Sequence, residues 1–182
     1  MKRLLPVLFM LLLFTLPALA QDQYPRAEVS GGYSYLNNDF VSTTRDSSHG
    51  WIFSVTGNGT KHLGLEVEGS GHYGSVLGAS YSNYLVMIGP RVAGRYEKVT
   101  PWGHTLFGVD HLRPGAGLTN ENSFTWLIGG GVDYNVNKNW AVRALQMDYF
   151  LVNFDSSNPL IGNRNAHNFR LSFGVVYKWG GK

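Results

Sequence analysis

Residues 63–73 read Leu-Gly-Leu-Glu-Val-Glu-Gly-Ser-Gly-His-Tyr and alternate between two chemically different faces. One face carries the apolar residues Leu63, Leu65, Val67 and Tyr73. The other face carries the polar residues Glu66, Glu68, Ser70 and His72. A period of two is the pattern of a β-strand whose two faces meet different surroundings. This segment therefore predicts a strand with one apolar and one polar face.

The same alternation recurs along the chain, and no stretch between residues 27 and 179 shows convincing helical periodicity. The ambiguous phase at 102–111 leaves open which residues of that segment share a face. At 139–152 the polar residues Arg143 and Asp148 differ in parity, which predicts a β-bulge between them. The pattern predicts eight strands, at about 27–36, 50–57, 63–73, 83–97, 102–111, 123–134, 139–152 and 167–179.

The links between these segments alternate between short and long. Short links with Asn, Gly or Pro, which favour tight turns, lie at residues 58–62, 98–101 and 135–138. The longer links are 37–49, 74–82, 112–122 and 153–166. In an up-and-down meander alternate links lie at opposite ends, so we expect one end with short turns and one with four longer loops.

Alternation alone does not say which face points inward. The polar face is rich in Gly, Ser, Thr and Asn, with few charges for a surface in water. Membrane barrels have short periplasmic turns and girdles of aromatic residues at both membrane interfaces. The aromatic residues expected at strand ends are Tyr33, Tyr35, Trp51, Tyr73, Tyr84, Tyr96, Trp102, Tyr134, Trp140, Tyr149, Tyr177 and Trp179.

These features favour an apolar face that points outward to lipid. The alternative is a soluble secreted or periplasmic lipid-binding barrel, whose apolar face points inward. The residues predicted to face lipid are Phe53, Leu65, Val67, Val86, Ile88, Trp126, Ile128, Leu171, Phe173 and Val175.

Four segments carry a resemblance to a known family: residues 27–35, 129–134, 143–149 and 169–177. They resemble the small outer-membrane β-barrel family that includes the transmembrane domain of outer membrane protein A. The resemblance implies an all-β fold, a closed antiparallel up-and-down eight-stranded transmembrane barrel in the cell outer membrane. It implies outer-membrane lipids and the assembly machinery as partners. Many such barrels end on an aromatic residue, whereas Gly180, Gly181 and Lys182 follow Trp179 here.

The first twenty residues have the pattern of a cleaved secretory signal peptide. Lys2 and Arg3 precede an apolar run from Leu4 to Leu16, and Ala18-Leu19-Ala20 has the form of a cleavage site. We expect a signal peptide at 1–20 and the barrel domain at 21–182. The absence of cysteine excludes a disulfide framework, a cysteine-based zinc site and a thiol nucleophile. A net charge of +3 gives no case for binding nucleic acid.

An eight-stranded barrel has an interior just wide enough for side chains to fill. We therefore expect the charged residues of the polar face to lie in the lumen and to pair with one another, because lone buried charges are costly. Such a network is either a structural plug or a gate over a narrow conducting path. The residues predicted for this lumen charge network are Glu66, Glu68, Arg91, Arg95, Arg143 and Arg170.

A lipid A-modifying outer-membrane enzyme is a further alternative. His111 follows Asp110, and Asp155, Ser156 and Ser157 precede His167, but no histidine has Ser two residues later, as the His-x-Ser pair of lipid A deacylases requires. We therefore predict no catalytic site. We predict no cofactor, and no metal site because the histidines are scattered over different segments.

Loops on a rigid barrel are where recognition of an external ligand is expected to concentrate. The loop residues considered for this role are Asp39, Phe40, Thr43, Thr44, Arg45, Phe154, Asp155, Pro159, Leu160 and Arg164.

Overall fold

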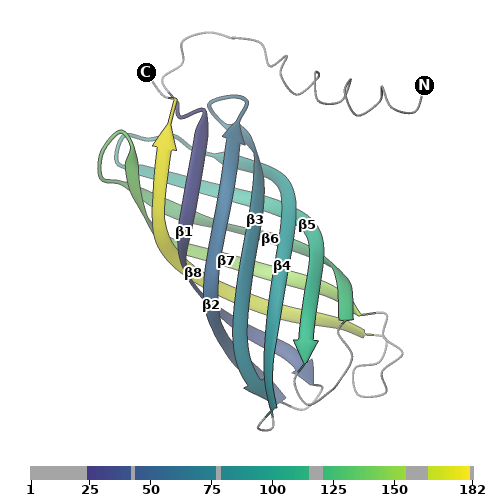
Figure 1. Cartoon of the computed structure of the whole chain (residues 1–182). Helices are drawn as coiled ribbons and strands as arrows, with labels where there is room; N and C mark the ends of the chain where they lie inside the picture. The colour runs from purple at the N-terminus through teal and green to yellow at the C-terminus, as the bar shows by residue number, and fades with distance from the viewer. Residues whose placement is uncertain (1–23, 42–43, 77–78, 115–120, 155–163, 181–182) are drawn as a thin grey trace, which may run out of the picture.

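The computed structural model of the chain is built from β-strands (Figure 1). The structure describes residues 24–41, 44–76, 79–114, 121–154 and 164–180. Within these ranges, the side chains at 38–41, 44–46, 76, 79, 114, 121, 152–154 and 164–166 are not described. The strands of this part of the chain are β1 (Ala27–Val41), β2 (Thr44–Asn58), β3 (Leu63–Val76), β4 (Ala79–Ala93), β5 (Val99–Pro114), β6 (Glu121–Asn135), β7 (Trp140–Phe154) and β8 (Arg164–Trp179).

These strands form one closed barrel in chain order, from β1 to β8 (Figure 1). Every neighbouring pair is antiparallel, and β1 pairs with β8 from Ala27 opposite Trp179 to Asn37 opposite Phe169. Because the barrel is closed, the backbone N–H and C=O groups of every strand are paired on both sides. A strand that crosses a lipid bilayer requires this pairing, because no water is present there to form hydrogen bonds with these groups. The prediction of a closed antiparallel eight-stranded barrel is confirmed.

The apolar face of the wall points outward and the polar face points inward. In β3 the side chain of Leu65 is 54 % exposed, whereas that of the next residue, Glu66, is 0 % exposed. Val86, Ile128 and Phe173 on other strands are likewise exposed on the outer surface. This is the facing of a barrel whose outer solvent is lipid. The alternative of a soluble barrel with an apolar interior is wrong.

At one end of the barrel, the turn end, the strands are joined by short turns, as predicted. At the turn end, residues 59–62, 94–98 and 136–139 join the strands. The second turn was predicted at 98–101, but Val99, Thr100 and Pro101 belong to β5. The described ends of the chain also lie here, because the Arg26 amide donates to the Trp179 carbonyl at 2.9 Å.

Two of the four predicted long loops are wrong. β1 continues to Val41 and β2 starts at Thr44, while β3 continues to Val76 and β4 starts at Ala79. Segments 37–49 and 74–82 are therefore mostly paired strands, although their Asn, Asp and Ser residues favour turns. Backbone pairing continues there because the neighbouring strands stay paired, with Asn38 opposite Asp46 and Val76 opposite Ala79. Only 115–120 and 155–163 separate strands at this loop end by more than two residues.

The two strands of uncertain phase are resolved. Register shifts on both sides of β7, between Arg143 and Gln146 against β8 and between Val132 and Asp133 against β6, place the predicted bulge there. Ala144 and Leu145 both lie exposed, so Arg143 and Asp148 can both face the interior despite their opposite parity. In β5 the residues that face inward include Trp102, His104, Leu106 and Asp110.

No helix in the described ranges has the length and apolar character needed to cross a membrane. The predicted signal segment, 1–20, lies outside the described residues.

Candidate functional site: the barrel interior

The six residues predicted for the lumen come from four strands and one turn and lie at or near the interior. Glu66, Glu68, Arg91, Arg143 and Arg170 are buried. The sixth, Arg95, lies in the turn that follows β4, where its side chain is 10 % exposed. Among the ion pairs of the described residues, only Arg170 and Glu68 pair within the predicted set. The other four bind residues that were not predicted.

Arg170 of β8 is the centre of a layer of charged side chains in the interior. Its guanidinium donates to Asp148 from Nε and Nη2, at 2.8 and 2.6 Å, and to Glu68 Oε1 at 2.5 Å. Gln146 donates to both of these carboxylates, at 3.2 Å to Glu68 and 2.9 Å to Asp148. Ser70 accepts a further bond from Arg170. The two negative charges are therefore held by one fixed cation, Arg170, and one neutral donor, the Gln146 amide.

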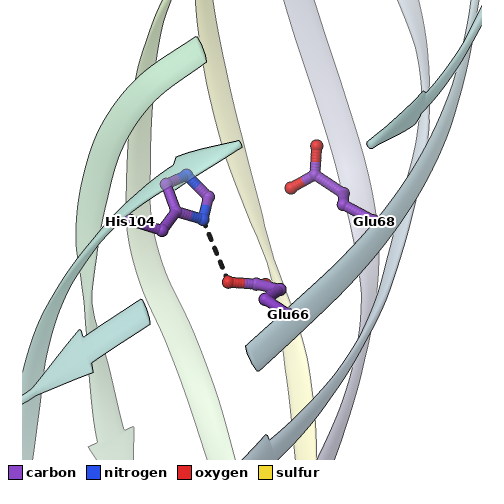
Figure 2. A group of neighbouring side chains, drawn as sticks. All are labelled: Glu66, Glu68 and His104. Atoms are coloured by element: carbon purple, nitrogen blue, oxygen red, sulfur yellow. Dashed lines mark hydrogen bonds and ion pairs between the residues drawn. The ribbon is translucent and has the colours of Figure 1, made fainter. Parts of the chain in front are cut away.

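His104 of β5 joins this layer to Glu66. Its Nδ1 lies 3.0 Å from Glu66 Oε2, the contact dashed in Figure 2, and its Nε2 lies 2.9 Å from Asp148 Oδ1. Glu66, Glu68 and His104 offer metal-ligand atoms within 4.8 Å of one another. Both ring nitrogens of His104 already face carboxylates, however, and Glu68 already accepts from Arg170. Among the described residues only Glu66 Oε1 of this group lacks a hydrogen-bond partner, so the group fits an ion-pair cluster better than a metal centre.

A second charged layer lies nearer the turn end. Asp133 of β6 accepts from Arg143 at 2.9 Å and from Arg91 at 3.3 Å. The Trp102 ring forms a cation–π contact with both guanidinium groups. Its centroid lies 4.3 Å from Arg91 Cζ and 4.4 Å from Arg143 Cζ. Trp102 was predicted for the outer aromatic girdle, and this is wrong. The phase of β5 turns it inward, where it is 6 % exposed.

Glu28 extends this layer toward the turns. It accepts from Arg95 at 2.5 Å and from the Asn58 amide at 2.9 Å, and it lies 3.8 Å from Arg91. Lys178 donates to Asn135 at 2.6 Å at the same end. Glu28, Asp133, Asp148 and Lys178 could have been found from the sequence, because each shares the polar face of its strand. His104 could not, because the phase of its strand was ambiguous.

An apolar layer closes the interior on the loop side of the charged layers. Its members come from β1, β4, β5, β6 and β7 and are all 0–3 % exposed. The Arg170 guanidinium carbon, Cζ, lies 4.8 Å from the centroid of the Phe150 ring, so this contact joins the apolar and charged layers directly. We call this layer the septum: Leu36, Leu85, Met87, Leu106, Leu127 and Phe150.

The outer face of the wall presents the residues predicted to face lipid. Eight of them are exposed: Phe53, Leu65, Val67, Val86, Ile88, Ile128, Phe173 and Val175. Trp126 and Leu171 are half-buried among neighbours on the same face. The Trp126 ring stacks on Phe107, and its indole N–H donates to Thr105 at 2.7 Å. Trp126 thus satisfies its polar group within the wall.

The residues considered for catalysis do not assemble into a triad among the described side chains. Asp110 is buried in the interior, whereas His111 lies on the opposite face and contacts Asn122 at 2.5 Å. His167 bonds Tyr149 on the outside of the wall. Asp155, Ser156 and Ser157 lie outside the described residues.

The loop residues considered for binding have no described side chains either. They are Asp39, Phe40, Thr43, Thr44, Arg45, Phe154, Asp155, Pro159, Leu160 and Arg164.

Residues 7–178 match the sequence profile of the outer membrane protein β-barrel domain. The chain belongs to this family. The match covers all of β1 to β7 and β8 up to Lys178, and it begins inside the predicted signal segment. No curated protein sequence matches the chain.

Solved structures place this family member among small outer-membrane barrels. The fold is similar to that of Neisserial surface protein A, with a TM-score of 0.70 and 14% identity, covering 84% of this chain and 97% of that one. Ail of Yersinia pestis gives a TM-score of 0.58 at 14% identity, covering 85% and 99%. OprG of Pseudomonas aeruginosa gives 0.57 at 14% identity, covering 88% and 98%. The protein is an outer-membrane β-barrel with transmembrane strands.

Proposed function

We propose that the protein is a closed outer-membrane scaffold that displays its loop-end connections at the cell surface and conducts no solute through its interior. The single observation that supports this role is that both apolar and charged side chains fill the lumen. The septum closes the loop side, and the paired layers around Arg170 and Asp133 fill the side toward the turns. A small barrel filled in this way is a packed core rather than a pore.

The charged layers act as a plug rather than a gate in this proposal. Arg170 is shared by Glu68 and Asp148, and Asp133 is shared by Arg91 and Arg143, so no single pair can switch without leaving a buried charge unpaired. Breaking a buried pair costs about 3–5 kcal/mol. The septum beside them contains no charged group that could rearrange.

Planar-bilayer recording tests the closed state. Purified wild-type protein should give no stable conductance. The triple variant Leu106→Ala, Leu127→Ala and Arg170→Ala removes side chains from both layers and should give short channel openings. Val86→Ala, which trims the outer face, is the control and should stay silent. Regular conductance steps in the wild type would show a gated path and overturn the proposal.

The displayed surface is the site proposed for an external ligand. The chain connections at 115–120 and 155–163 are the longest at the loop end. Ail of Yersinia pestis, which shares the fold, has been solved in complex with the heparin analogue sucrose octasulfate, so a barrel of this kind can hold a ligand. Replacing 155–163 with a short Asn-Gly turn should leave barrel assembly intact. Failure to assemble would make this connection part of the fold instead.

We also propose that residues 1–20 are removed during export and that 21–182 form the mature domain, with outer-membrane lipids and the assembly machinery as partners. Sequencing the N-terminus of the protein recovered from outer membranes should give Gln21 as the first residue. An N-terminus at Met1 would contradict the proposal. The proposal assigns the barrel no reaction, cofactor or metal-dependent chemistry.

A further inference from the structure

A separate polar group lies directly on the loop side of the septum. Along β5 the inward positions run from Leu106 of the septum through Gly108 to Asp110. In the same direction from the septum, the next inward positions are Asn83 on β4, two residues from Leu85, and Thr125 and Ser123 on β6, two and four residues from Leu127. These four polar side chains are 0–8 % exposed. Because their strands are adjacent in the wall, the group forms one patch of the interior.

Asp110 differs from the other lumen carboxylates. Glu28, Glu66, Glu68, Asp133 and Asp148 each lie within 4.0 Å of an arginine or a histidine. Asp110 has no ion pair among the described residues, and its hydrogen bond there is to the Asn83 amide at 3.2 Å. It is 2 % exposed. A buried carboxylate without a partner is costly, and the protein relieves that cost everywhere else in the lumen.

The unsatisfied atoms of this patch are all oxygens. Asp110 Oδ1, Asn83 Oδ1 and Thr125 Oγ1 are buried and have no hydrogen-bond partner among the described residues. Asp110 lies opposite Ser123 in the β5–β6 register, and Thr125 is two residues further along β6, within diagonal reach. A proton on Asp110 would satisfy one of these oxygens. A cation among them would satisfy several oxygens and also supply the missing positive charge.

We propose that Asp110, Asn83, Ser123 and Thr125 bind a hard divalent cation of the Ca²⁺ type in the loop-side interior. Carboxylate, amide and hydroxyl oxygens are hard ligands that suit Ca²⁺, which accepts six to eight oxygens in flexible geometry. Water molecules complete the shell. One carboxylate gives weak affinity, in the range of about 10⁻⁴–10⁻³ M that is typical of extracellular calcium modules.

The group of Glu66, Glu68 and His104 provides the contrast within the same lumen. Its carboxylates are paired with Arg170 and His104, and only Glu66 Oε1 lacks a hydrogen-bond partner among the described residues, against three oxygens in the Asp110 patch. Along β5, His104 lies on the turn side of Leu106 of the septum, whereas Asp110 lies on its loop side. A cation site is therefore expected where oxygens are free, and not where acidic groups are merely close together.

Calorimetric titration of Ca²⁺ into the metal-free barrel, refolded in detergent without lipopolysaccharide, tests the site. The wild type should bind one Ca²⁺ saturably, and Asp110→Asn should bind at least about tenfold more weakly. Glu97→Gln, which removes an exposed carboxylate at the turn end, should bind like the wild type. Gel mobility before and after boiling shows whether each variant has assembled.

Thr125→Val and Asn83→Leu are tested beside Asp110→Asn, so that the result does not depend on one variant that assembles poorly. Each should weaken Ca²⁺ binding severalfold while the barrel still assembles. The proposal is overturned if the wild type gives no saturable binding up to about 10 mM, ten times the weakest expected dissociation constant. It is equally overturned if the assembled variants bind as tightly as the wild type.

Discussion

Arg170 and Asp148 face each other across the β7–β8 seam, and the arginine holds the carboxylate with two donors, Nε at 2.8 Å and Nη2 at 2.6 Å from Oδ2. The same Nη2 reaches Glu68 on β3, more than a hundred residues away in sequence. One guanidinium thus connects opposite parts of the wall through the lumen. The pairing thus joins β8 to both β7 and β3 through the charged interior.

Removing this arginine should destabilise the barrel strongly. Arg170→Ala leaves Glu68 and Asp148 buried without their fixed cation, which costs about 3–5 kcal/mol in the free energy of unfolding. Urea unfolding in lipid vesicles measures the change. Arg113→Ala removes an exposed arginine and should change stability little. Equal losses in the two variants would mean that the lumen pairing contributes no more than a surface charge.

The facing of the wall predicts opposite outcomes for two neighbouring residues of β8. Phe173 is 58 % exposed on the outer face, whereas Ser172 is buried in the lumen. Phe173→Arg places a charge in the lipid and should cost about 2–4 kcal/mol, enough to impair assembly. Ser172→Ala should be tolerated. The mobility of the outer-membrane protein on gels before and after boiling reports assembly, and identical behaviour of the two variants would contradict the assigned facing.

The strands, their facing and the closure of the barrel could be predicted because period-two alternation is a local property of the sequence. Leu65 and Glu66 are consecutive residues of one strand, so one side chain faces outward and the other inward. The lumen partners depend on which strands meet across the interior, and this is set by register. That is why Glu66 could be assigned to the lumen while its partner His104, 38 residues away, could not.

Strand ends were predicted less well for a physical reason. Residues such as Asn38 and Asp46 favour turns, yet they pair in register beyond the expected end of the strand. Turn propensity therefore does not mark where the pairing of a hairpin stops. Trp102 was misplaced for a related reason, since an aromatic residue near a strand end suits either the girdle or the lumen.

The inward position of Trp102 can be checked by fluorescence in lipid vesicles. In variants that keep a single tryptophan, Trp140 should be quenched by brominated lipid, because it is exposed on the outer wall. Trp102 should resist both brominated lipid and aqueous acrylamide, because it is buried between Arg91 and Arg143. Strong quenching of Trp102 by brominated lipid would show that its side chain faces the lipid and not the lumen.

The closing seam should depend on two glycines that lie opposite each other, Gly32 of β1 and Gly174 of β8. A Cβ on Gly32 would collide with the backbone carbonyl of Phe173, which cannot move without opening the β1–β8 ladder. Gly32→Ala should therefore cost at least about 1–3 kcal/mol, the usual range for overpacking. Gly57→Ala is the matched control, because nothing lies within 4 Å of a Cβ there. Urea unfolding in vesicles should show a lower midpoint for Gly32→Ala alone, and equal midpoints would mean that the seam relaxes around the extra methyl group.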